Sequence, residues 1–207
     1  MPIPGPSSKV TIRPLHPFSP NCLHMPTAGS TIQLFATAFD QDGLIVSTTF
    51  TWTSGSPAVA TVNSSTGLVT GVGPGICNIQ AQANDSGAAK GSIAVGVALL
   101  SANSLTIAYG QTVTLSSVGN FPTVNWVSGA DGAAQVYAGT LVNGFIVPDH
   151  SFGDIGWNAG PTATIITPVY QGPGTPATAH VPVQVSVGGI YCQAVVNVTG
   201  VPAWFGV

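Results

Sequence analysis

Charged side chains are almost missing from this sequence. Asp, Glu, Lys and Arg make up only 4% of its 207 residues, against roughly 25% in an average soluble domain. The chain has three Lys and Arg residues and six acidic residues, all of them Asp. Nucleic-acid binding depends on clustered Lys and Arg that neutralise phosphates. The composition therefore excludes nucleic acid as a main partner.

Long apolar runs are also missing. The most apolar stretch, residues 93–100, contains Gly96 and is followed by Ser-Ala-Asn-Ser, so it is too short to span a bilayer. The first residues, "MPIPGPSSK", lack the basic and then apolar pattern of a secretory signal. We therefore expect no membrane insertion. We also expect either a removed signal or another route out of the cell, such as virion assembly followed by lysis.

No segment shows a sustained helical period, whereas strand and turn signals are frequent. The chain contains 26 Gly and 17 Pro, and 44% of its residues are hydrophobic. Residues 31–40 alternate strictly, with Ile32, Leu34, Ala36 and Ala38 set against Thr31, Gln33, Phe35, Thr37 and Phe39. Turn signals recur about every 8–12 residues, a spacing that suits a β-sandwich. The sequence predicts an all-β protein.

Four motifs carry a family resemblance over residues 9–97. They are "VTIRP", "AGSTIQLFATAFDQDG", "FTWTSGSPAVATVNSSTGLVTGVGPG" and "ICNIQAQA". Together they resemble the bacterial immunoglobulin-like domain, group 2. The resemblance implies a Greek-key β-sandwich in which Trp52 packs in the core between the sheets. The Pro-rich "PLHPFSPNCLHMPTAG" and Cys77 depart from the usual pattern.

The second half of the chain repeats these signals weakly. "SLTIAYGQTVTLSS" and "TVNWVSG" echo the earlier "TIQLFATA" and "FTWTSG", and they place Trp126 where Trp52 stands in the first half. We expect tandem immunoglobulin-like Greek-key β-sandwiches at residues 9–99 and 100–200. An extended arm at 1–8 would precede them, and an aromatic tail at 201–207 would follow.

The three cysteines, Cys22, Cys77 and Cys192, leave two alternatives open. An odd count leaves at least one thiol unpaired within the chain, or paired between chains. All three could be small buried apolar side chains. Alternatively, Cys22 and Cys77 could form a disulfide.

Candidates for catalysis or metal binding are weak. His150 stands near Asp149 and Asp154, but neither a nucleophile motif nor a further His/Cys cluster accompanies them. Asp40 and Asp42 in "DQDG" could ligate Ca²⁺, yet no further acidic residue follows at the spacing that six or more oxygen ligands require. We therefore predict a polar loop and a turn, and no catalytic residue, metal site or cofactor.

Aromatic residues outside the sandwich pattern are the better candidates for a functional role. Trp204 and Phe205 stand at the C-terminal end, and Phe152 and Trp157 lie in a long connection between strands. Aromatic anchors are enriched at protein–protein interfaces. We predict these four residues as interface residues, with Trp157 alternatively stacking on a sugar ring.

Three functions are compatible with these observations. The first is a non-enzymatic structural protein of a phage virion, such as a capsid-decoration, head-fibre or tail accessory component. The family resemblance implies it, because tailed phages commonly carry such domains on virion proteins. The second is a bacterial cell-surface adhesin or pilus-like fragment. The third is a carbohydrate-binding module that uses residues 145–160 to bind a host-surface glycan. The first two predict protein subunits as partners, an oligomeric or lattice-bound state, and a virion, extracellular or cell-surface location.

Overall fold

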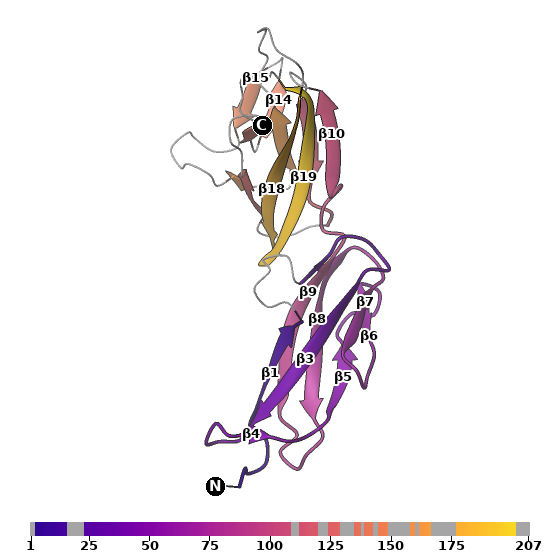
Figure 1. The fold of residues 1–207 in the computed structure, drawn as a ribbon, viewed down its shortest axis with the longest axis vertical. Helices are drawn as coiled ribbons and strands as arrows, with labels where there is room; N and C mark the ends of the chain where they lie inside the picture. Colours follow the sequence, from indigo (N-terminus) through magenta and orange to yellow (C-terminus); the bar gives the residue numbers. More distant parts are fainter. Residues whose placement is uncertain are drawn as a thin grey trace. The chain divides into compact units, whose positions relative to one another are not determined.

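The computed structural model of the chain forms two compact units, Met1–Ala98 and Leu99–Val207 (Figure 1). It describes residues 3–15, 23–108, 112–119, 124–128, 135–137, 139–142, 145–148, 158–159, 162–166 and 177–201. All regular secondary structure in these ranges is β-strand. The chain thus follows its turn-rich, helix-poor composition.

Two sheets form the first unit. One has the order β1-β3-β7-β6, with β4 pairing the far end of β3, and the other has the order β2-β9-β8-β5. The strands of the first sheet are β1 (Lys9–Pro14), β3 (Thr31–Phe39), β4 (Ile45–Val46), β6 (Ala60–Val62) and β7 (Leu68–Gly71). Those of the second are β2 (His24–Met25), β5 (Phe50–Ser54), β8 (Gly75–Ala83) and β9 (Lys90–Val97). This is the strand order of an immunoglobulin-type sandwich.

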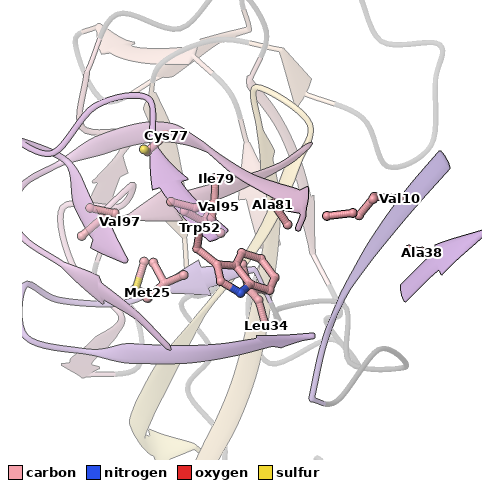
Figure 2. Close-up of a cluster of buried hydrophobic side chains, with 13 residues drawn as sticks. Val10, Met25, Leu34, Ala38, Trp52, Cys77, Ile79, Ala81, Val95 and Val97 are labelled. Carbon is pink, nitrogen blue, oxygen red and sulfur yellow. The ribbon is translucent and has the colours of Figure 1, made fainter. Parts of the chain in front are cut away.

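Strand alternation builds one core between these sheets. Leu34 and Ala38 of β3 are buried, as the period-2 pattern predicts. Trp52 of β5 is 4% exposed and lies among the core side chains. Figure 2 shows its indole beside Leu34, with Met25 and Ile79 nearby. Burying an aromatic side chain of this size makes a large hydrophobic contribution to stability.

Gly67 explains why the motif around Trp52 needs a glycine. It precedes β7 in the β6–β7 hairpin and has φ of 73°. A Cβ atom at Gly67 would lie 2.7 Å from Cε2 of Trp52 and 2.9 Å from the carbonyl oxygen of Leu34. Any larger residue would be strained at this φ and would push the indole away. The hairpin glycine is therefore part of the Trp52 packing.

The second unit repeats the arrangement. One sheet has the order β10-β19-β18-β12-β16, and a second has the order β11-β17-β13, with a separate β14-β15 pair. The strands of the first sheet are β10 (Ser104–Ala108), β12 (Val124–Ser128), β16 (Asn158–Ala159), β18 (Ala177–Val187) and β19 (Ile190–Val201). The others are β11 (Thr112–Ser116), β13 (Gln135–Tyr137), β14 (Gly139–Val142), β15 (Phe145–Pro148) and β17 (Thr162–Ile166). The prediction of an all-β chain with tandem immunoglobulin-like sandwiches is confirmed.

The two predicted core tryptophans lie on corresponding strands. Trp52 is on β5, which pairs with β8, and Trp126 is on β12, which pairs with β18. Trp52 is opposite Ala81, and Trp126 is opposite Val185. Trp52 is buried as its motif predicts. The side chain of Trp126 lies outside the described atoms, so its core position stays a prediction.

Candidate interaction surface

The outward face of the β1-β3-β7 sheet, called here the β3 face, is unusually apolar. Its side chains are those that alternate with the core residues: Lys9, Thr11, Arg13, Leu15, Thr31, Gln33, Phe35, Thr37, Phe39, Ile45, Leu68 and Thr70. Four of them, Leu15, Phe35, Ile45 and Leu68, are exposed large hydrophobic residues. The same alternation that buries Leu34 thus places Phe35 against solvent.

Strand register places three of these apolar side chains in two neighbouring rows of the face, around Gln33. Arg13 is opposite Phe35, and Gln33 is opposite Leu68. The N–H of Leu15 donates to the carbonyl oxygen of Gln33 at 3.1 Å, so Leu15 follows the same register. Leu15 and Leu68 are therefore diagonal neighbours of Phe35 on the two adjoining strands. Their exposed fractions are 56% for Leu15, 42% for Phe35 and 39% for Leu68.

Two of the three cations of the chain lie on this face. Lys9 is opposite Phe39, and Arg13 is opposite Phe35. Both cations are exposed, and neither forms an ion pair or a side-chain hydrogen bond within the described residues. They sit beside aromatic residues without a counter-charge on the same face. This arrangement leaves both charges available to a partner.

The opposite face of the sandwich, called here the β8 face, is polar and nearly uncharged. Its central rows run Thr51–Gln82–Lys90 and Thr53–Gln80–Ser92 across β5, β8 and β9, with Asn78 beyond them. Lys90 is its only charged side chain among these positions. Hydroxyl and amide groups of this kind stay hydrated without a partner. The apolar surface of this sandwich is therefore concentrated on one side.

Two aspartates fasten the N-terminal arm to the first sandwich. Asp85 accepts hydrogen bonds from the N–H and the hydroxyl of Ser7, both at 2.6 Å. Asp40 accepts the N–H of Gly5 at 2.9 Å. A Cβ atom at Gly87 would overlap the backbone of Ser7, so this glycine lets the arm approach closely. The arm is thus ordered at residues 5–8 by contacts far along the chain.

These contacts shift the acidity of both carboxyl groups. The hydroxyl and then the N–H of Ser7 hold the pKa of Asp85 below its ordinary value. The N–H of Gly5, helped by those of Leu44 and Asp42, holds the pKa of Asp40 below its ordinary value. Hydrogen bonds to a carboxylate favour its charged form. Both groups are therefore anionic at neutral pH.

Asp40 is consequently a structural residue of the turn after β3. Its Oδ1 accepts the N–H groups of Asp42 and Leu44, both at 2.9 Å, while its Oδ2 accepts Gly5. The residue is only 4% exposed. The structure has a turn directly after Asp40, where the sequence predicts one. In the described ranges, no group of three or more His, Cys, Asp or Glu side chains could hold a metal ion.

His24 is the one buried titratable group of β2. It is 9% exposed, and its Nε2 has no hydrogen-bond partner in the described part of the chain. Burial lowers its pKa to about 4. The imidazole is therefore neutral at physiological pH, because desolvation disfavours its charged form. Nothing in the sequence predicts this burial, because His24 stands close to Pro26 and is typical of a loop position.

The described cysteines are buried thiols. Cys77 is a free thiol on β8 whose sulfur lies 3.2 Å from the hydroxyl oxygen of Ser54. Cys192 of β19 is also free, and burial raises its pKa to about 12. Cys22 lies outside the described residues. Cys77 packs as a small buried side chain, and the Cys22–Cys77 alternative stays a prediction.

The predicted aromatic interface residues are not part of the described structure. Trp204, Phe205, Trp157 and Phe152 lie outside the described ranges, as do His150, Asp149 and Asp154. Their roles stay predictions. No helix in the described ranges is long and apolar enough to cross a membrane. The surface that the structure does offer, the β3 face, uses residues that sequence reasoning had assigned to an ordinary strand.

Comparison with solved structures finds several distant matches. The S-layer protein rSbsC(31-844) has 18% identity, with 93% of this chain and 28% of that protein covered, and a TM-score of 0.33. Domains 4 and 5 of the S-layer protein SbsC have 18% identity, 94% and 99% coverage, and a TM-score of 0.34. A C-terminal 282-residue intimin fragment, in complex with the intimin-binding domain of the translocated intimin receptor, has 12% identity, 95% and 64% coverage, and a TM-score of 0.37. The chain thus spans little more than a quarter of rSbsC(31-844).

Comparison with protein families gives a more specific result for the first unit. No curated protein matches the chain. The model of the bacterial Ig-like domain (group 2) matches residues 28–93. These residues include β3, the Trp52 strand and the Gly67 hairpin, while β1 lies before the matched range and completes the sheet. Residues 28–93 therefore carry a group 2 bacterial immunoglobulin-like domain, as their motifs predict.

Proposed function

We propose that this chain is a non-enzymatic structural component of an assembled surface, and specifically of a phage virion, where it mediates protein–protein contact. The observation that carries the proposal is the exposed cluster of Leu15, Phe35 and Leu68 on the β3 face. Neighbouring exposed apolar side chains on an otherwise polar sandwich are typical of interaction surfaces.

The composition supports the same function. Removing charges from water is costly when an interface forms, unless each charge finds a well-placed partner. A chain with 4% charged residues incurs little of this cost. Its hydroxyl and amide groups can instead be shared with a neighbouring subunit or with interfacial water. Such a surface suits close packing in a capsid or tail better than long-range attraction of a diffusing ligand.

The family supports the virion assignment. Residues 28–93 match a group 2 bacterial immunoglobulin-like domain, and tailed phages commonly display such domains on virion proteins. The same family also occurs on bacterial surfaces, so a cell-surface adhesin is the competing assignment.

Immunogold labelling separates these assignments. Antibodies raised against the whole chain would be applied to purified particles released from the encoding organism, and in parallel to its intact cells. We expect regular labelling of heads or tails. Labelling of the cell envelope with bare particles would assign the chain to an adhesin, and absence of label from both would contradict a surface role.

A further inference from the structure

We propose that the β3 face binds an extended acidic segment of another protein. This inference rests on the proposed function and names the chemistry of the partner. The face combines the apolar cluster of Leu15, Phe35 and Leu68 with Arg13 and Lys9, two cations that have no ion-pair partner among the described residues. A partner that covers the cluster must also cover these two charges.

Charge complementarity makes that partner acidic. The outward positions of β1, β3, β4 and β7 carry two cations and no acidic residue, although the chain as a whole has a formal net charge of −3. The nearest acidic residues along these strands are Asp40 and Asp42 in the turn after β3. The carboxylate of Asp40 is already used by N–H groups of Gly5, Asp42 and Leu44. The outward strand positions therefore carry net positive charge, strongest at Arg13, which is farther than Lys9 from the anionic turn of Asp40 and Asp42.

The spacing of the two cations suggests the form of the segment. Arg13 and Lys9 are four residues apart on one strand, which corresponds to about 13 Å along β1. A partner in extended conformation with carboxylates four residues apart would present them at the same interval. An apolar side chain two residues beyond the carboxylate that faces Arg13 would lie over the row of Leu15 and Leu68, next to Phe35. Arg13 contributes most, because a guanidinium pairs with a carboxylate through two parallel hydrogen bonds.

Other macromolecules fit this face less well. Nucleic acid requires several phosphate contacts, and the face supplies two cations. An anionic membrane attracts clusters of four to eight Lys and Arg residues. Apolar side chains beside two widely spaced charges match a protein segment better than either polyanion.

A peptide comparison with the full chain tests this proposal. The probe is a 12-residue Ser/Thr peptide with two Leu residues and two Asp residues four positions apart. Its counterparts carry Asn or Lys in place of both Asp residues. Fluorescence anisotropy should show about fivefold tighter binding of the Asp peptide than of the Asn peptide at low salt, with the difference shrinking as salt screens the charges.

Charge reversal locates the binding face. Arg13→Glu should abolish the preference for the Asp peptide, and Phe35→Ser should weaken binding of both the Asp and the Asn peptide. Lys90→Glu, the matched reversal on the β8 face, should leave binding unchanged. Thermal melts of all three variants establish that each is folded.

Several outcomes would overturn the proposal. They are equal binding of the Asp and Asn peptides, preference for the Lys peptide, no binding of any peptide, or equal effects of Arg13→Glu and Lys90→Glu. Tighter binding to phosphatidylglycerol vesicles or to a DNA duplex would also overturn it. The labelling experiment is independent: labelled particles without an acidic preference refute only this inference, whereas an acidic preference without labelled particles refutes only the virion assignment.

Discussion

The two outward faces of the first sandwich share a core and a strand alternation, yet they carry different chemistry. The β3 face exposes Phe35 and Leu68 and also carries Arg13, whereas the β8 face presents rows such as Thr53–Gln80–Ser92. Folding requires only that the inward positions be apolar. The outward positions are free to differ, so an apolar outward face points to a use beyond folding.

The largest expected effect concerns the core that both faces share. Trp52→Ala should lower the free energy of unfolding of the first unit by about 3–5 kcal/mol, because it leaves a cavity where a 4%-exposed indole packs. Chemical denaturation of the full chain and of this variant measures the change. The exposed Thr53→Ala on the same strand serves as control. A Trp52→Ala loss as small as that of the control would mean that the indole does not hold the two sheets together.

The free energy of unfolding of the first unit should depend on pH in two ranges, one set by a residue of each sheet. His24 belongs to the sheet of the β8 face, and burial lowers its pKa from 6.5 to about 4. Between these values the unfolded chain binds a proton that the folded chain does not, so this contribution to stability falls as pH falls from about 6.5 to 4. Asp40, at the end of β3, has a lowered pKa, so its contribution is present above its ordinary value of 3.8 and is lost below it.

Denaturation midpoints between pH 7 and 3 test this difference. His24→Leu should flatten the dependence between pH 6.5 and 4, while Asp40→Asn should leave that range unchanged and flatten it below. An unchanged slope in the His24→Leu variant would show that His24 is protonated in the folded state.

A local effect is expected where the arm meets the first sandwich. Asp85→Asn removes the carboxylate that accepts the N–H and hydroxyl of Ser7. Hydrogen exchange should accelerate at the N–H of Ser7, and at that of Ala89, which donates to the Ser7 hydroxyl. Strands β3 and β8 should keep their protection. The exposed Asp42→Asn is the matched control, and equal acceleration in both variants would rule out a specific role for Asp85.

The smallest effect on stability should come from exchanging outward residues between the faces. Phe35→Thr and Thr53→Phe should each change the free energy of unfolding by about 1 kcal/mol or less, because neither side chain belongs to the core. Denaturation curves of the two variants, measured beside the unchanged chain, provide the comparison. A large loss for Phe35→Thr would assign Phe35 to folding and would remove the argument for an interaction surface.

Sequence reasoning reached the fold because its signals are local. The alternation around Leu34 and the motif around Trp52 are readable within a few residues, and both follow the predicted pattern. The interaction surface depends on register instead. Nothing local shows that Leu15 and Leu68, on two other strands, come to flank Phe35. The same limit applies to Ser7 and Asp85, which are 78 positions apart and meet only in the folded chain.

The fastening of residues 5–8 has a mechanical consequence. A pulling force applied at the N-terminal end would load the hydrogen bonds of Gly5 with Asp40 and of Ser7 with Asp85 before it reached the β1–β3 ladder. Residues 5 and 7 precede the ladder, which begins at Lys9, so loss of these bonds would leave the β1–β3 pairs in place. The arm would then lengthen under a small force before the strands of the sandwich separate.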